Sequence, residues 1–314
     1  MEYDEFKKMF MEEVEHEIKE RIIEGVTISN EEIRSPEGMT DRLIVKMENS
    51  NISMAFRLQE IYEDYDGRLE VQVEGLVDTI QENMNVREKE ADVKSFIMDF
   101  DKAKDHLHLR LIPGDSPALS DTPHVMIEDM ALVANLDIVG FAEDGRTCAI
   151  ICDALLAHYG ISKDELFEIA RDNSVAMEPL RFESLEHKVA CLLHEDDIDV
   201  PVDMNNTAYI ATNTSGFNGA SVIAYPDFNE KAVETMGGSF YMIPSSVHEF
   251  ILIKDDGGIN AKYLNAMIRD VNKNTLKPKD RLSSQCYHYD AKTKKLEQGL
   301  KFDKRNKEKK VGAR

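Results

Sequence analysis

Leu107-His108-Leu109-Arg110-Leu111-Ile112-Pro113-Gly114 is the stretch that decides the fold class of this 314-residue chain. Leucine recurs at every second position, and this period predicts a strand with one buried face that Pro113-Gly114 then ends. A hairpin is predicted next, over about residues 126–151, because the tight-turn dipeptide Asp144-Gly145 lies between two apolar runs. Strands joined through short turns in this way pair antiparallel.

Helices are predicted between such strands. The N-terminal segment carries an apolar residue at every fourth position from Phe6 to Ile22 and is ended by Gly25, which indicates an amphipathic helix. Ser162 and Glu165 form a capping box at the start of a second helix, and Asn260 is suited to cap a third. Two further helices are predicted at residues 58–65 and 69–83. Strands are predicted at residues 26–28, 42–47, 208–211, 221–224, 240–243 and 249–254, with a last hairpin at 285–296.

The order of these elements predicts the fold class and the domain organisation. Helices and strands alternate without regular β-α-β spacing, so we expect an α+β fold with mixed, mainly antiparallel sheets and packed helices. The acidic stretch 195–201 is the best candidate for a linker between two subdomains. It separates a central segment (99–194) from a C-terminal one (202–298), and an N-terminal segment (1–98) precedes both. The sequence leaves open whether this stretch divides domains or bridges two parts of one.

The charge is strongly negative and unevenly distributed. The chain has 38 Lys and Arg against 60 Asp and Glu, a net charge of −22, yet Lys301 to Arg314 alone carries a net +5. An acidic body repels nucleic acid and anionic membrane. The basic residues 299–314 are predicted to be a disordered tail, which is either simply solvated, folded back on the body or available to nucleic acid.

Composition also bounds the location and the chemistry. No apolar run approaches the roughly 20 residues that span a bilayer, and the acidic N-terminus differs from a signal peptide, so we expect a cytoplasmic protein. Four cysteines (Cys148, Cys152, Cys191 and Cys286) form no C-x-x-C pair. Cys148 and Cys152 lie in an apolar run and are interpreted as core thiols. The nine histidines match no metal-binding spacing. We therefore expect neither a metal nor a cofactor.

The segment Ile243-Pro-Ser-Ser-Val-His-Glu-Phe250 holds the first candidate site. Ser245, Ser246, His248 and Glu249 are residue types that acyl transfer uses. Their local order does not match a catalytic triad, and no G-x-S-x-G elbow exposes the serine. The alternative interpretation is a turn in which the serines bind the local backbone.

A glycine-rich loop between two predicted strands holds the second candidate site. Its candidate ligand-binding residues are Asn213, Ser215, Gly216, Asn218 and Gly219. Glycines in such a loop let the backbone approach a phosphate, but neither the G-x-G-x-x-G nor the P-loop pattern is present. A plain connecting loop is the alternative.

Several longer strings carry a resemblance to a known family. They are Ala208-Tyr-Ile-Ala-Thr-Asn213, Gly219-Ala-Ser-Val-Ile-Ala-Tyr225-Pro226, Ile243-Pro-Ser-Ser-Val-His-Glu249 and Met267-Ile-Arg-Asp-Val-Asn272, with Ser162 to Ala170 upstream. Over about residues 40–298 the chain resembles the uncharacterised clostridial domain-of-unknown-function family numbered five-six-eight-eight. The resemblance implies a cytoplasmic bacterial protein, and the family has no assigned activity.

Two functional hypotheses remain. The first is a non-enzymatic acidic module that binds a protein partner, since no nucleotide loop, metal set or nucleophile motif is found; in one variant the acidic body mimics nucleic acid. The second is a hydrolase-like enzyme or small-ligand binder whose site joins the Ser245–Glu249 turn to the Asn213–Gly219 loop. It requires those two segments to lie together.

Overall fold

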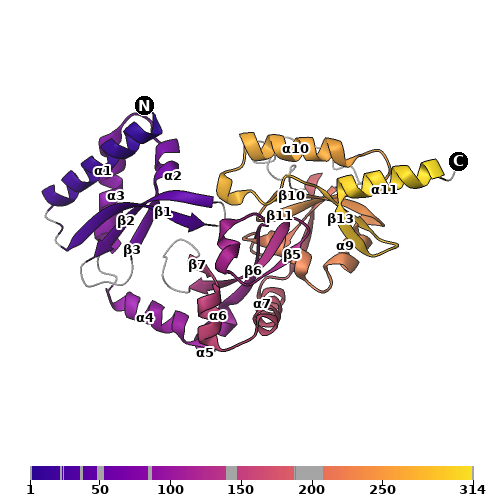
Figure 1. Ribbon diagram of the computed structural model, residues 1–314, viewed down its shortest axis with the longest axis horizontal. Helices are drawn as coiled ribbons and strands as arrows, with labels where there is room; N and C mark the ends of the chain where they lie inside the picture. The colour runs from indigo at the N-terminus through magenta and orange to yellow at the C-terminus, as the bar shows by residue number, and fades with distance from the viewer. Residues whose placement is uncertain are drawn as a thin grey trace.

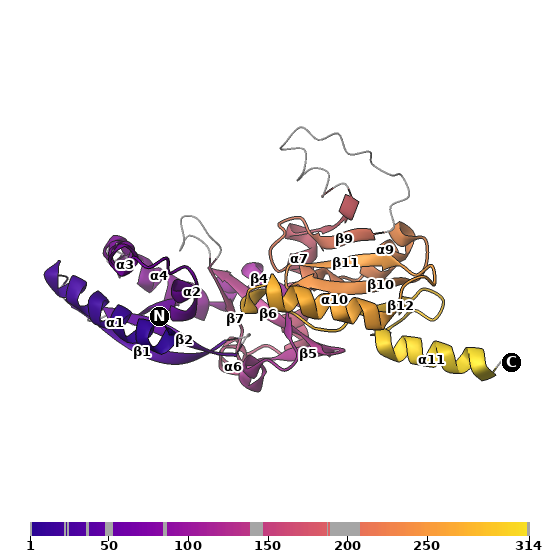
Figure 2. The same cartoon turned by 90° about the horizontal axis from the view of Figure 1, so that it is seen from above.

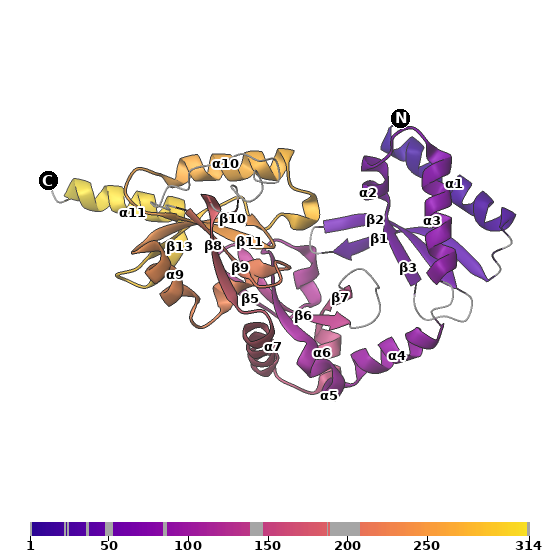
Figure 3. The same ribbon diagram turned by 180° about the vertical axis from the view of Figure 1, so that it is seen from behind.

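A computed structural model of the chain describes residues 2–21, 23, 25–35, 38–47, 53–83, 87–138, 147–186, 188 and 208–312. Helices alternate with antiparallel sheets along these residues, which confirms the predicted α+β fold (Figure 1). The N-terminal layer lies at one end of the molecule and the last helix at the other, as the view from behind also shows (Figure 3).

The N-terminal layer is a three-stranded sheet covered by helices. Strands β1 (Val26–Ser35), β2 (Gly38–Met47) and β3 (Ser53–Arg57) pair in that order, and the predicted helices are α1 (Tyr3–Glu20), α2 (Leu58–Glu63) and α3 (Leu69–Asn83). The predicted four-residue spacing places Phe6 and Phe10 in a core with Val45 and Ile80. The sequence analysis missed β3.

The central sheet is built around β6 (Met130–Ile138). β4 (Leu107–Pro113) pairs with one side of β6, whereas β5 (His124–Ile127) and β7 (Thr147–Ile150) share the other side. The single predicted hairpin is therefore wrong in its first half. A turn at Glu128-Asp129, where Glu128 has a φ of 55°, splits it into two hairpins. Residues other than glycine rarely adopt this φ, so the dipeptide Glu128-Asp129 does not predict a turn from its sequence. The predicted turn at Asp144-Gly145 lies outside the described residues.

The C-terminal sheet has six antiparallel strands in the order β13-β12-β10-β11-β9-β8. Their bounds are β8 (Leu180–Ser184), β9 (Ala208–Asn213), β10 (Phe240–Ser246), β11 (Glu249–Lys254), β12 (Tyr287–Asp290) and β13 (Lys295–Gln298). The predicted strand at 221–224 is wrong, because Gly219–Ala224 forms a 3-10 helix, η4. Asn218, with a φ of 50°, turns the chain out of β9's direction just before it. The residues of η4 from Gly219 to Ile223 are buried, so the apolar character of this segment reflects its burial and does not indicate a strand.

The remaining helices complete the layers. They are α4 (Arg87–Met98), α5 (Phe100–Ala103), η2 (Lys104–His106), η3 (Pro117–Asp121), α6 (Asp153–Tyr159), α7 (Lys163–Met177), α9 (Phe228–Met236), α10 (Ala261–Asn274), η5 (Pro278–Asp280) and α11 (Gly299–Gly312). The capping predictions are confirmed, since Ser162 Oγ accepts from Glu165 N at 3.2 Å and Asn260 Oδ1 accepts from Tyr263 N at 3.1 Å. Within the described part of the chain, no helix is long and apolar enough to cross a bilayer.

One hydrophobic core joins the central and C-terminal sheets. Leu109 of β4 and Leu132 of β6 belong to the same buried cluster as Met242 and Phe250 of the six-stranded sheet. The opposite face of that sheet is covered by α10 and by Phe302 near the start of α11, and α11 then runs on past the sheet (Figure 2). The predicted segments 99–194 and 202–298 thus share a core, and the predicted linker between them, 195–201, lies outside the described residues.

The basic C-terminal segment is ordered where disorder was predicted. Residues 299–312 form α11, and Phe302 is buried at 7% exposure with its ring stacked on that of His288 at 3.4 Å between centroids. Asp303 accepts hydrogen bonds from Tyr241 Oη at 2.8 Å and Ala261 N at 2.9 Å. The prediction of disorder is wrong for residues 299–312, because one buried aromatic residue, Phe302, anchors a segment that is otherwise rich in lysine. Residues 313–314 lie outside the described part of the chain.

Truncation of the anchor should release α11. Phe302→Ala is expected to lower the free energy of unfolding by about 3 kcal/mol, as for other buried phenylalanines. Amide hydrogen exchange over residues 299–308 should become fast. Leu300→Ala, at a 45% exposed position of the same helix, is the matched control. Equal effects of the two substitutions would contradict the anchoring role of Phe302.

The buried His288 should make stability depend on pH. Burial lowers its pKa, although the hydrogen bond from its Nε2 to Asp255 at 2.9 Å acts in the opposite direction. The unfolded chain therefore binds this proton more readily than the folded chain. The contribution of neutral His288 is complete above pH of about 6.5 and is lost as pH falls below that value.

Replacing His288 should change how the stability of the protein depends on pH. His288→Asn removes the titrating group, so the stability gap between wild type and variant should narrow between about pH 7.5 and about pH 5.5. Urea unfolding at both pH values measures this gap. A gap that stays constant would show that His288 is not the group responsible.

Candidate functional site

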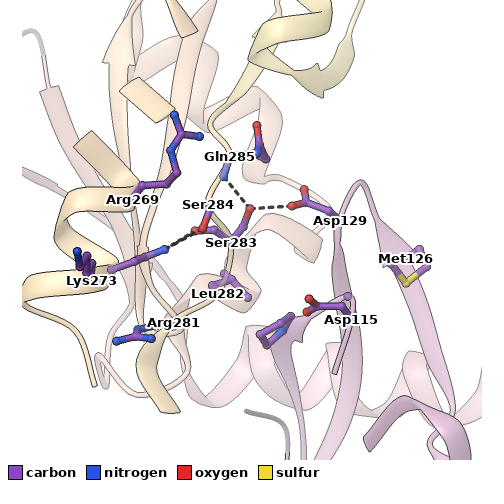
Figure 4. A pocket seen from close by; sticks show the side chains of 13 residues that line it. Asp115, Met126, Asp129, Arg269, Lys273, Arg281, Leu282, Ser283, Ser284 and Gln285 are labelled. Atoms are coloured by element: carbon purple, nitrogen blue, oxygen red, sulfur yellow. Dashed lines mark hydrogen bonds between the residues drawn. The ribbon is translucent and has the colours of Figure 1, made fainter. Parts of the chain in front are cut away.

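A cavity of about 740 Å³ opens between the central and C-terminal sheets (Figure 4). Its walls come from the end of β4, the β5–β6 turn, one flank of α10 and the segment 281–285 that leads into β12. We call it the basic cleft, after Arg269, Lys273 and Arg281, which line it together with Asp115, Asp129, Ser283 and Ser284.

Helix α10 presents two of the three cations. Arg269 and Lys273 lie four residues apart and therefore share one flank of the helix. The helix is held in place by its buried face, where Leu264 and Ile268 meet the sheet. Among the described residues, neither Arg269 nor Lys273 has a carboxylate within salt-bridge distance. Both charges are therefore available at the cleft.

Arg281 is the third cation and is fixed by the backbone. Its Nε and Nη2 donate to the carbonyl oxygen of Leu276 at 3.3 and 3.1 Å. A neutral carbonyl orients the guanidinium without cancelling its charge. The positive charge of Arg281 thus remains available to a ligand.

The carboxylate of Asp129 accepts hydrogen bonds from residues on the other side of the cleft wall. It accepts hydrogen bonds from Ser283 Oγ at 2.8 Å and from Tyr287 Oη at 2.7 Å, with Gln298 Nε2 at 3.4 Å. Burial and the neighbouring Asp129 charge raise the pKa of Tyr287, so its hydroxyl keeps the proton that it donates. Asp129 therefore ties the β5–β6 turn to the segment that carries Ser283.

Gly114 closes the wall on the side of β4. Its amide donates to the carbonyl oxygen of Asp129 at 2.9 Å. A Cβ at this position would lie 2.6 Å from the same oxygen and 2.7 Å from Met126 Cε. Only glycine allows the two backbones to approach so closely, which gives the Pro113-Gly114 strand end a second purpose.

The first predicted candidate site forms a turn between β10 and β11. Ser245 Oγ donates to Glu249 Oε1 at 3.3 Å, and Ser246 Oγ accepts from the backbone amide of His248 at 3.0 Å. Both hydroxyls thus bind groups other than the His248 ring. The turn interpretation describes this geometry better than the catalytic one.

The second predicted candidate, the Asn213–Gly219 loop, lies directly against that turn. The amide of Asn218 donates to His248 Nδ1 at 3.1 Å. Gly219 is buried, and a Cβ there would lie 2.5 Å from the carbonyl oxygen of His248. The structure therefore brings the two predicted segments together, as the second hypothesis required, and tight packing occupies the contact between them.

The other residues of the loop are held by internal hydrogen bonds or face outward. Asn213 is 1% exposed and donates to Glu178 Oε2 at 2.7 Å and to the carbonyl oxygen of Phe217 at 3.0 Å. Ser215 and Gly216 are exposed, and Ser215 Oγ donates to Asn213 Oδ1 at 3.1 Å. The buried members of the set shape the loop.

This turn also supports the basic cleft. His248 Nε2 lies 3.5 Å from Asp280 Oδ1, and the amide of Val247 donates to the carbonyl oxygen of Asp280 at 2.9 Å. Asp280 immediately precedes Arg281. The predicted site residues thus fix the start of the segment that lines the cleft.

The sequence analysis missed the cleft itself. Asp129 and Ser283 are 154 residues apart, so no local pattern joins them. The sequence does contain one pattern that indicates a basic surface, the pair Arg269 and Lys273 four residues apart on a predicted helix. The prediction of that helix used only its cap and its apolar positions. In the described part of the chain, no cluster of three or more His, Cys, Asp or Glu could hold a metal ion.

Comparison with known families places these residues in a wider group. The sequence profile of a family of unknown function, DUF5688, matches residues 3–291. The chain belongs to this family. The match confirms the resemblance seen in the sequence, extends it over α1 and β1, and ends at residue 291. It includes every cation of the basic cleft. No curated protein and no solved structure matches the chain.

The contact between His248 and Asn218 is expected to stabilise the fold. His248→Ala leaves the Asn218 amide without its acceptor, which should cost about 1–3 kcal/mol of unfolding free energy. His248→Asn places an amide oxygen near the same position and should recover part of the loss. Thr214→Ala, at an exposed position of the same loop whose side chain forms no hydrogen bond with a described residue, is the control. Urea unfolding of the three variants checks this order, and an unchanged His248→Ala would contradict it.

Proposed function

We propose that this chain is a non-enzymatic binding protein that holds the oxyanion group of a ligand, a carboxylate or a phosphate, in the basic cleft. One observation carries the proposal. Arg269, Lys273 and Arg281 line a single cavity of about 740 Å³, although the chain as a whole has a net charge of −22. Although the chain has 60 acidic residues, none of those that the structure describes forms a salt bridge with these cations.

The chemistry of the lining supports an oxyanion. Arginine offers several N–H donors in a plane, which suits the two oxygens of a carboxylate or phosphate. Ser284 Oγ accepts a hydrogen bond from Asn272 Nδ2 at 3.4 Å, so its own proton is free for a ligand. Asp129 is already bound by Ser283 and Tyr287, which reduces its repulsion of an incoming anion.

The alternative function, a hydrolase-like site at the Ser245–Glu249 turn, has one supporting observation. The turn and the Asn213–Gly219 loop do meet, through Asn218 and His248. General-base catalysis needs an imidazole nitrogen within reach of the hydroxyl proton. Here His248 Nδ1 accepts from a backbone amide and Nε2 faces Asp280. Binding at the cleft is the better supported function.

Titration with simple anions tests the proposal. Inorganic phosphate and citrate are titrated calorimetrically into the full chain at about 0.05 and about 0.5 M salt, which spans the range of ionic screening. We expect binding of at least one of the two anions, weaker at high salt. Arg269→Ser and Lys273→Ser should each weaken it about tenfold, the equivalent of about 1.4 kcal/mol.

The control carries the same change in net charge at another place. Lys163→Ser, at the exposed start of α7, removes one positive charge outside the cleft and should leave the affinity unchanged. Arg269 and Lys273 have no salt bridge with any described residue to lose, so their variants should unfold as wild type does. Failure of both anions to bind, or equal weakening by Lys163→Ser, would overturn the proposal.

A further inference from the structure

Helix α10 carries an exposed apolar stripe beside the basic cleft. Tyr263, Met267 and Val271 are 61%, 42% and 40% exposed and lie four residues apart. We call these three residues the α10 stripe. The helix buries a different set, which includes Leu264 and Ile268, against the sheet. The stripe therefore adds little to the fold, although it places three large apolar side chains in water.

The cations of α10 lie along one side of this stripe. Lys262 lies about two turns before Arg269 and about three turns before Lys273 on the same flank, and it too has no salt bridge among the described residues. At 100° per residue, the ridge between the stripe and this basic flank is formed by Ala266 and Asp270. Figure 2 shows α10 on the outer side of the sheet, where this ridge meets solvent.

The dimensions suit one kind of occupant. From Tyr263 to Val271 the stripe is about 12 Å long, which is about two helical turns. Amphipathic helices dock through apolar residues at such spacings. A ridge with an apolar side and a positive side is complementary to a helix that is apolar on one side and acidic on the other.

We propose that α10 docks an acidic amphipathic helix of a partner protein. Apolar side chains of that helix lie on the α10 stripe, and its carboxylates reach Lys262 and the basic cleft. This proposal rests on the proposed function, because Arg269 and Lys273 belong to both surfaces, and it names the source of the oxyanion. A second copy of the chain offers no such helix in α1, whose Phe6 and Phe10 are buried in their own core.

Asp270 distinguishes an acidic partner helix from a basic one. It lies on the ridge, where it faces the carboxylates of an acidic partner and opposes binding. Its Oδ1 accepts a hydrogen bond from Asn274 on the same helix at 2.9 Å, and it forms no salt bridge with a described residue. Asp270→Asn should therefore strengthen the binding of an acidic helix, whereas it would weaken the binding of a basic one.

The probe is a fluorescent synthetic peptide of about 18 residues, or about 27 Å of helix. Leucines occupy one face and glutamates the neighbouring positions, with alanine elsewhere. A second peptide has the same composition with the leucines distributed around the helix. Fluorescence anisotropy measures the affinity of each peptide for the full chain.

We expect the amphipathic peptide to bind and its scrambled counterpart to bind at least about fivefold more weakly, since hot-spot contacts need aligned side chains. Tyr263→Ser, Met267→Ser and Lys262→Ser should each weaken binding at least about threefold, and Asp270→Asn should strengthen it about twofold. Met177→Ser, at a 59% exposed methionine of α7, is the matched control and should have no effect.

The anion titration separates the two proposals. Citrate or phosphate binding that persists in Met267→Ser while the peptide affinity falls supports both. Anion binding without any effect of the α10 stripe variants on the peptide overturns the docking proposal and leaves the proposed function intact. A concentration-dependent self-association that Met267→Ser abolishes, measured by sedimentation, would assign the stripe to a second copy and also overturn the proposal.

Discussion

The hydrogen bonds to Asp129 hold together the part of the structure on which the cleft depends. Asp129 lies in the β5–β6 turn of the central sheet, and its partners Ser283, Tyr287 and Gln298 belong to the C-terminal sheet or lead into it. A charged acceptor strengthens each of these hydrogen bonds. Glu128 of the same turn also binds Lys301 of α11 at 3.0 Å. One tight turn therefore connects the two sheets and the last helix.

The cleft exists because two backbones are held at fixed separations on either side of it. On one side, Gly114 allows β4 to approach the β5–β6 turn without steric conflict. On the other side, His248 and the amide of Val247 hold Asp280, and the backbone beyond it continues to Arg281 and Ser283. The turn that is rich in serine and histidine is thus a structural support of the binding surface. Its residue types arise from the need to satisfy buried polar groups.

Charge distribution gives the molecule a binding surface that its overall charge conceals. Some cations of this acidic protein are neutralised by neighbouring carboxylates, as Lys279 is by Glu60 at 3.2 Å and Lys188 by Glu249 at 3.2 Å. On the flank of α10, Arg269 and Lys273 line a cavity instead, and Lys262 is exposed to solvent. Long-range repulsion from the acidic body would be felt by any anion, so a ligand must gain enough from close contacts in the cleft to offset it.

Local patterns determined most of the secondary structure of this protein. The two-residue period of Leu107–Leu111, the capping box at Ser162 and the cap at Asn260 each predicted an element that the structure contains, because such signals act over a few residues. Tertiary structure alone decided the η4 helix, the order of residues 299–312 and the basic cleft. In these cases the deciding contact joins distant residues: Gly219 with His248, Phe302 with His288, and Asp129 with Ser283. A contact across 154 residues leaves no periodic trace in the chain, because it forms only when two separately folded surfaces meet.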